Sequence, residues 1–160
     1  AMNLLMQGMA FMEIGQEFGR TKLDATGENG ELTHDDRERA MNSYNAPDSV
    51  NQVNWDLINE RQDSIEFIRQ MIRLKTETSA FSYPTYDEIY HHVFVHSAHE
   101  HSGWIVYEIH GEEHLLVVFN AKGQDFKFEN AGNLELLVTN SHLNDKDMVG
   151  GVSASVYKVL

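Results

Sequence analysis

The sequence predicts a mainly β chain, with an antiparallel β-sandwich over residues 82–160 that is preceded by α/β structure over residues 1–81. The first part contains one helix with a wide apolar face and one short apolar run, whereas the second part alternates apolar and polar residues in short segments. Glycine-containing turns separate these segments. Several short strands with regular turns are typical of a sandwich.

The start of the chain predicts the end of a helix followed by a buried strand. Residues 3–7 have helical character and are followed by Gly8, which is typical of a helix C-terminus. Residues 9–14 are almost continuously apolar, as expected for a strand covered on both faces. Gly15 and the polar residues 16–22 follow as a loop, so the segment predicts one αβ step of an α/β protein.

A long polar loop is predicted over residues 23–60, which contain Gly27 and Pro47. A loop of this length inside a compact domain is usually functional or disordered. Thr33 is a suitable N-cap for a short helix that runs through Ala40.

A second helix is predicted over residues 63–76, because Ile65, Ile68 and Ile72 lie on one stripe. After Phe81 the helical period gives way to strand patterns. The predicted strands cover residues 89–97, 103–110, 114–121, 124–129, 133–139 and 151–159.

The charge and composition exclude several classes of partner. The formal net charge is −13, from 12 Lys and Arg against 25 Asp and Glu. Nucleic acid and anionic membranes both require a basic surface, so neither is expected as a partner. The chain has no cysteine, which excludes disulfides and cysteine-based sites. No apolar run is long enough to cross a membrane.

Three segments carry a family resemblance: Gln7 through Lys22, with the run GQEFGRTK; Asn42 through Trp55, with the run NSYNAPDSVNQVNW; and Met71 through Lys75 with the following Ala80-Phe81. Together they resemble the C-terminal part of the type I pullulanases, which are glycoside hydrolases of the α-amylase superfamily. The departures are small: Met9 replaces the usual Ile, Ala10 the usual Pro, and Asn54 a common Asp. The resemblance covers residues 2–81 well, and beyond them it depends on strand order.

The resemblance implies that residues 1–81 are the last αβα step of a (β/α)8 catalytic barrel and that residues 82–160 are the all-β C-terminal domain. The family hydrolyses α-1,6 glucosidic links with retention, which requires two carboxyl groups. In the family these carboxylates lie on barrel strands that would precede Ala1, so no catalytic residue is expected here and the chain alone is expected to be inactive. Glu17 would normally suggest catalysis, because it ends a barrel strand. The family gives it no such role, so an ion pair with Arg20 or a supporting position behind the substrate-binding residues is expected.

The long loop is expected to border the active site of the parent enzyme, as βα loops of barrels do. Planar polar groups and aromatic faces suit sugars. The candidate substrate-binding residues are Arg20, Lys22, Asn42, Tyr44, Asp48 and Asn51. The alternative is a loop held together by its own hydrogen bonds, in which Asp48 after Pro47 is turn chemistry.

The histidines do not predict a metal site. Eight of the nine follow residue 90, and His96, His99 and His101 crowd one predicted hairpin. A strand and a turn can present several imidazoles to Zn²⁺. However, His91 and His92 are neighbours in a predicted strand and would point to opposite faces. His99 and His101 are expected in an exposed turn, so neither a metal nor another cofactor is predicted.

Two classes of function stay open. The first is part of a hydrolase that debranches pullulan, starch or glycogen, with an α-glucan as substrate. The second is a stand-alone carbohydrate-binding or interaction β-module without catalysis. Because an apolar strand without barrel neighbours seeks partners, residues 9–14 are expected to be disordered, to pack back on the sandwich or to swap between copies. A homo-oligomer through these residues would be a sign of the swap. If Leu160 is the native end, the absence of a wall-anchoring tail favours the cytoplasm over an extracellular location.

Overall fold

The computed structural model describes residues 1–98, 101–129, 132–143 and 147–160. The chain forms two compact units. The sheet unit comprises residues 1–11 and 66–160, and the loop unit comprises residues 12–65. Helix α5 (Gln62–Glu77) is the segment through which the chain passes from the loop unit into the sheet unit. Within the described ranges, no helix has the length and apolarity needed to cross a membrane.

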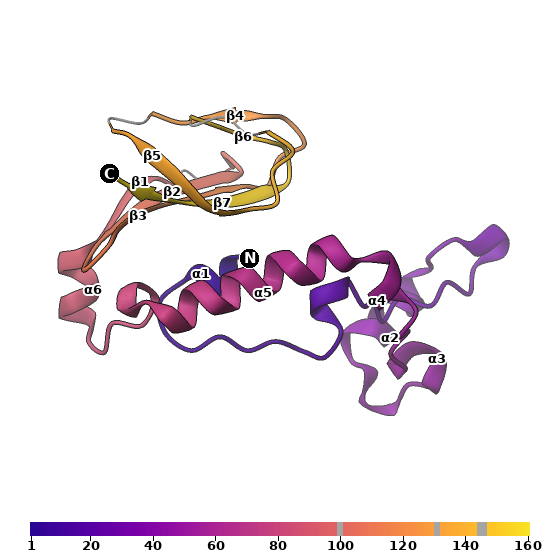
Figure 1. Ribbon diagram of the computed structural model, residues 1–160. Helices are drawn as coiled ribbons and strands as arrows, with labels where there is room; N and C mark the ends of the chain where they lie inside the picture. The colour runs from indigo at the N-terminus through magenta and orange to yellow at the C-terminus, as the bar shows by residue number, and fades with distance from the viewer. Residues whose placement is uncertain (99–100, 130–131, 144–146) are drawn as a thin grey trace. The chain divides into compact units, whose positions relative to one another are not determined.

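The sheet unit is built on a five-stranded antiparallel sheet, which confirms the predicted antiparallel β structure (Figure 1). The strand order is β1-β2-β3-β7-β5. The bounds are β1 (Val93–Ser97), β2 (Trp104–His110), β3 (His114–Asn120), β5 (Leu134–Thr139) and β7 (Ser153–Val159). A second, two-stranded ribbon pairs β4 (Phe126–Lys127) with β6 (Met148–Val149).

The ribbon covers one face of the large sheet, as the layers of Figure 1 show. Val106, Leu116 and Val118 point from β2 and β3 into a core that also contains Phe128 and Val149 from the ribbon side. These sheet residues all have even numbers, because successive side chains of a strand point to opposite faces. These even-numbered side chains of β2 and β3 therefore form part of an apolar core between the two layers.

The opposite face of the sheet is covered by helices of the same unit. Helix α1 (Met2–Leu5) and the sheet-unit part of α5 lie beneath it in Figure 1. Leu5 and Met71 are 1% and 0% exposed, and Ile109 on the sheet is 0% exposed. The hydroxyl of Tyr107 donates a hydrogen bond to the carbonyl of Leu5, which connects the start of the chain to β2.

Substitution of Tyr107 by Phe is expected to lower the free energy of unfolding by about 1–3 kcal/mol, because the buried carbonyl of Leu5 loses its donor. Burial also raises the pKa of Tyr107, so the phenol is a protonated donor at neutral pH. Urea denaturation measures the change. Tyr86→Phe is the matched control, since Tyr86 is 80% exposed and its hydroxyl can be hydrated. Equal effects of both substitutions would contradict the assigned role.

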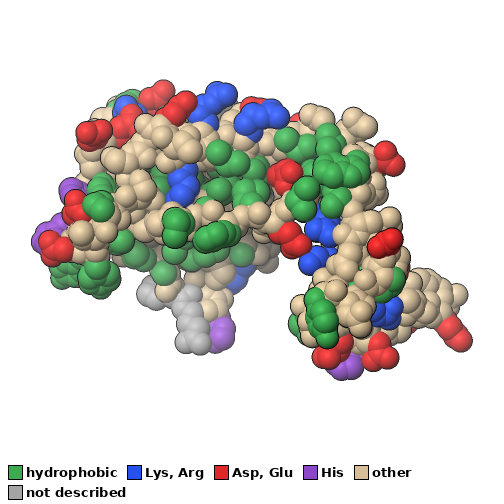
Figure 2. All heavy atoms as spheres, turned by 90° about the horizontal axis from the view of Figure 1, so that it is seen from below, with side chains coloured by type: hydrophobic (Ala, Val, Ile, Leu, Met, Phe, Trp, Pro, Cys, Tyr) green, Lys and Arg blue, Asp and Glu red, His purple; other side chains and the backbone are tan. Residues whose placement is uncertain are grey.

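The predicted strand over residues 9–14 is wrong for this structure. The segment forms no strand, and Met9, Phe11 and Ile14 are 87%, 78% and 56% exposed. Hydrophobic side chains, green in Figure 2, reach the surface on the side of the molecule that this view presents. The physical reason is that a strand needs backbone partners on a neighbouring strand, and no described strand pairs with this segment.

Two further strand predictions need correction. The predicted strand 89–97 begins at Val93, because helix α6 (Tyr86–His92) occupies its first part. The hydroxyl of Thr85 accepts a hydrogen bond of 3.2 Å from the Glu88 N–H and caps this helix. The predicted strand 124–129 is reduced to β4, and β6 was not predicted. A short 3-10 turn, η4 (Ser79–Phe81), precedes α6.

The loop unit contains short helical turns. They are η1 (Gln16–Phe18), η2 (Glu28–Gly30), α2 (His34–Met41), η3 (Ser43–Asn45), α3 (Asp48–Asn51) and α4 (Leu57–Glu60). The predicted helix after Thr33 is confirmed as α2. The boundary between residues 81 and 82, expected from the family resemblance, stays a prediction about the parent enzyme.

Candidate functional site

The six candidate substrate-binding residues all lie in the loop unit, where the structure divides them into two groups. Arg20, Lys22 and Asn51 take part in the hydrogen bonds and ion pairs that hold the loop together. Asn42, Tyr44 and Asp48 are exposed. The two alternatives considered from the sequence, a binding surface and a self-supporting loop, therefore each describe part of the same segment.

Arg20 is the central cation of the loop unit. Its side chain is 10% exposed, and Nη1 lies 3.2 Å from Oε1 of Glu13. Nη2 donates a hydrogen bond to the carbonyl of Asn51, which joins the residues before the long loop to a later part of that loop. Gly15 makes this position possible, because a Cβ there would lie 2.7 Å from the Cβ of Arg20. Arg20 thus connects the segment after Gly8 to helix α3.

The expected ion pair between Glu17 and Arg20 is wrong for this structure. Arg20 pairs with Glu13 instead. Gly15 has a positive φ of 89°, and its carbonyl accepts a hydrogen bond of 2.8 Å from the Arg20 N–H. This turn brings Arg20 back beside Glu13, while Glu17 lies on η1. Lys22 also contacts Glu13 at 3.0 Å, and its hydrogen bond and charge, with a further contribution from Arg20, lower the pKa of the Glu13 carboxyl.

Asn51 closes the middle of the loop. Its side-chain amide donates hydrogen bonds of 2.8 Å and 3.1 Å to the carbonyls of Ser43 and Ala46. Ser43 and Ala46 lie on either side of Tyr44 in the sequence, and Tyr44 is 88% exposed. Asn51 therefore fixes the short turn that presents Tyr44 to solvent.

The sequence reasoning missed Asp36, which organises the other half of the loop unit. Its carboxylate accepts hydrogen bonds from the Thr26 N–H at 3.1 Å, from the Thr26 hydroxyl at 2.7 Å and from the Thr33 N–H at 2.9 Å. Arg39 adds a contact of 3.0 Å. The signal was present, because Thr33 and Asp36 have the spacing of a capping box.

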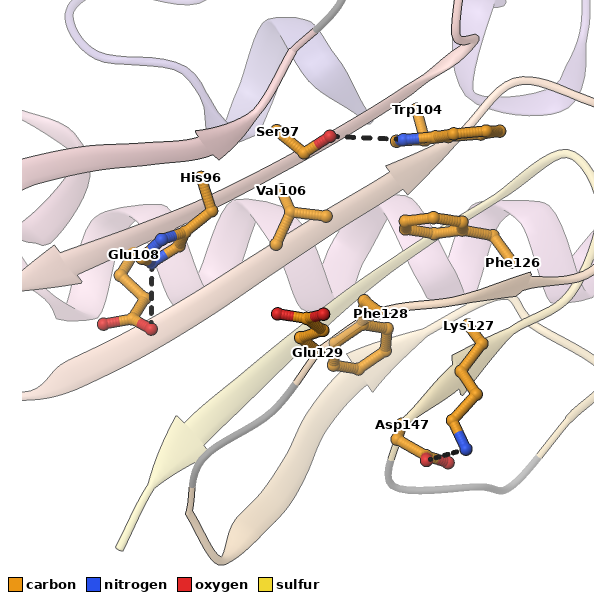
Figure 3. Close-up of a pocket in the computed structure, with 10 residues that line it drawn as sticks. All are labelled: His96, Ser97, Trp104, Val106, Glu108, Phe126, Lys127, Phe128, Glu129 and Asp147. Carbon is orange, nitrogen blue, oxygen red and sulfur yellow. Dashed lines mark hydrogen bonds and ion pairs between the residues drawn. The ribbon is translucent and has the colours of Figure 1, made fainter.

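A second candidate site lies in the sheet unit, where a cavity of about 1230 Å³ opens between the large sheet and β4 (Figure 3). Trp104 and Phe126 stack at one end of it, with ring centroids 4.6 Å apart. The Trp104 ring also lies 4.9 Å from the ammonium of Lys122. Because Trp104 already has these two partners, the ring is not a free platform for a sugar.

The other end of the cavity carries Glu108 and His96. Burial raises the pKa of the Glu108 carboxyl, but hydrogen bonds from His110 and His114, together with the charges of His96 and His114, outweigh the effect of burial, so the pKa is lowered. Of the histidines that crowd the predicted hairpin, His101 is exposed, and His99 lies outside the described residues.

Comparison with known proteins identifies similar sequences and structures. No family model matches the chain. The chain is 32% identical over 101 residues to a pullulanase of Bacillus subtilis, a match that spans 63% of this chain and 12% of the relative. The chain therefore corresponds to a small part of that protein.

Solved structures match almost the whole chain. A pullulanase of Anoxybacillus sp. LM18-11 complexed with maltotetraose matches with a TM-score of 0.75 and 25% identity over 99% of this chain and 22% of its own. A pullulanase of Paenibacillus barengoltzii complexed with maltohexaose and α-cyclodextrin matches with a TM-score of 0.74 and 27% identity over 98% of this chain and 24% of its own.

The glycogen-degrading pneumococcal virulence factor SpuA has the same fold over 99% of this chain, with a TM-score of 0.75 and 21% identity. The matches in sequence and in structure agree with the resemblance identified from the three sequence segments. This chain is a relative, in sequence and in fold, of one segment of the pullulanases.

Proposed function

We propose that the chain is part of a glycoside hydrolase that cleaves α-1,6 glucosidic links in pullulan, starch or glycogen. The observation that carries this proposal is the match of almost the entire chain to pullulanases, some of which were solved with bound maltooligosaccharides. The chain spans 22% and 24% of those two proteins, so the activity belongs to a longer protein.

In this proposal the catalytic carboxylates lie on barrel strands outside the chain. Retaining hydrolysis requires two carboxyl groups about 5–5.5 Å apart, and the family resemblance assigns neither to this segment. Residues 1–81 supply the last αβα step of the barrel, and residues 82–160 supply the β-domain that supports it. The exposed apolar side chains of Met9 and Phe11 support this arrangement, because neighbouring barrel strands would bury them. A homo-oligomer through the same residues stays a prediction.

The loop unit has two roles in the proposal. Arg20, Lys22 and Asn51 hold the loop in shape through the contacts described above. Asn42, Tyr44 and Asp48 face the glucan, and the exposed ring of Tyr44 can stack on a sugar face. Glu17 has a supporting position and no part in the chemistry.

Two assays test whether the catalytic carboxylates lie outside this chain and whether the chain works as part of a longer hydrolase. The 160-residue chain, incubated with pullulan, is expected to release no reducing ends. A chimera of the Bacillus subtilis pullulanase, in which this chain replaces the matching segment, is expected to hydrolyse pullulan. Hydrolysis by the chain alone would contradict the placement of the carboxylates, and a folded but inactive chimera would contradict the proposed function. Binding of pullulan by the chain alone, without hydrolysis in the chimera, would favour the stand-alone binding module.

Tyr44→Ala in the active chimera is expected to raise the KM for pullulan by about two- to tenfold, because a sugar contact of ordinary strength is lost. The kcat is expected to change less, since Tyr44 is proposed to contact the substrate and to take no part in the chemistry. Met41→Ala is the matched control, because Met41 is 79% exposed on the neighbouring helix α2 and is not a candidate contact. An unchanged KM in Tyr44→Ala would remove Tyr44 from the substrate surface.

A further inference from the structure

Three side chains at one end of the large sheet bring their ligand atoms together. Glu108 and His110 lie on β2, His114 begins β3, and one ligand atom of each lies within 4.8 Å of the others. Oε2 of Glu108 is 2.6 Å from Nε2 of His110 and 2.7 Å from Nε2 of His114. One carboxylate oxygen thus lies within hydrogen-bond distance of two imidazole nitrogens.

The strand pairing explains why these residues meet. Glu108 and His110 are two residues apart on β2, so they lie on the same face of the sheet. His110 pairs directly with His114 across the β2–β3 hairpin, and the two rings lie 4.1 Å apart. The cluster is therefore held by paired strands, which position side chains more precisely than loops do.

The second oxygen of Glu108 has its own partner. Nε2 of His96, on β1, lies 3.0 Å from Oε1 of Glu108 (Figure 3). His110 is also oriented, because its ring lies 4.7 Å from that of Phe94. Carboxylates and histidines that bind metals commonly have such outer partners, which hold the ligands in place.

From this geometry we propose that Glu108, His110 and His114 form a binding site for a divalent transition-metal ion, best matched by Zn²⁺, and that His96 orients the carboxylate. Two imidazole nitrogens and one carboxylate oxygen are ligands that Zn²⁺ accepts, with a fourth position left for water. Mg²⁺ and Ca²⁺ prefer oxygen ligands, so the imidazoles disfavour them. The net charge of −13 favours the approach of cations.

The sequence does not indicate this site, because the histidines that lie closest together in the hairpin sequence are His96, His99 and His101. The ligands proposed here are brought together by the pairing of two strands. The proposal does not depend on the proposed hydrolase function, because it concerns a cluster in the sheet unit.

Isothermal titration of the metal-stripped, untagged chain with ZnCl₂ tests the site. We expect one ion per chain, with the affinity weakened at least about tenfold by His110→Gln and by His114→Gln. His96→Gln is expected to weaken binding by about tenfold, as the loss of an orienting partner does. His34→Gln is the matched control, because the His34 side chain is 83% exposed and lies in the loop unit.

Melting curves with excess EDTA show whether each variant is folded without metal. Zn²⁺ is expected to raise the Tm of the unsubstituted chain and of His34→Gln by more than it raises that of His110→Gln. If His114→Gln does not fold, Glu108→Gln, which keeps the shape of the side chain, takes its place. No binding by the unsubstituted chain, or equal affinity in His110→Gln and His34→Gln, would overturn the proposal.

Discussion

Phe81→Ala is expected to lower the free energy of unfolding of the chain by about 3–5 kcal/mol. Phe81 is 0% exposed and ends the 3-10 turn η4 in the sheet unit. Its carbonyl accepts hydrogen bonds of 3.1 Å from the Gly8 N–H and of 3.1 Å from Nζ of Lys75. The backbone of Phe81 therefore connects the start of the chain to α5, and the Lys75 ammonium lies 5.9 Å from the Phe81 ring. Removal of this fully buried ring leaves a cavity.

Urea denaturation followed by circular dichroism measures this loss. The matched control is Phe11→Ala, which makes the same chemical change at a residue that is 78% exposed. A change within about 0.5 kcal/mol is expected for the control, as for most exposed positions. If both substitutions cost the same, burial in this structure does not explain the stability of the sheet unit.

Asp36→Ala is expected to open the loop unit while leaving the sheet unit folded. Asp36 is 2% exposed, and its removal leaves the N–H of Thr33 and the backbone and side chain of Thr26 without their shared acceptor. Unsatisfied buried donors are costly, so limited proteolysis between residues 21 and 46 is expected to be at least about tenfold faster. Asp35→Ala is the matched control, because Asp35 is its exposed neighbour in the first turn of α2.

The same network predicts a dependence on pH. Hydrogen bonds from Thr26, and then from Thr33, hold the pKa of the Asp36 carboxyl well below its usual range. Because the folded pKa lies below the unfolded value of about 3.9, the stabilisation is present above that value and is lost as the pH falls below it. Proteolysis with an acid-active protease is therefore expected to accelerate below about pH 4 in the unsubstituted chain. Asp36→Asn, which lacks this ionisation, is expected to show a smaller change with pH.

The sequence pattern predicts the elements that pack on the core well. The strands β2, β3, β5 and β7 lie within the predicted ranges, because short apolar runs bounded by turn residues are typical of strands. β3 is buried on both faces over most of its length, so it is predicted by its continuous apolar run and not by alternation. Helix α5 lies where its apolar stripe predicted it. Helix α6 was missed, although Thr85 and Glu88 have the spacing of a helix N-terminus, because its apolar residues also suit a strand.

The family relationship could also be identified from the sequence alone. Three segments carry many residues of the family pattern at fixed spacing, and such a match depends on residue identities and not on the fold. The tertiary structure decided the rest. It determined that Glu13 and not Glu17 pairs with Arg20, because a left-handed glycine turns the chain between them. It determined that residues 9–14 form no strand, because a strand exists only with a partner. It also brought Glu108, His110 and His114 together, because cross-strand register depends on which strands pair and not on distance along the chain.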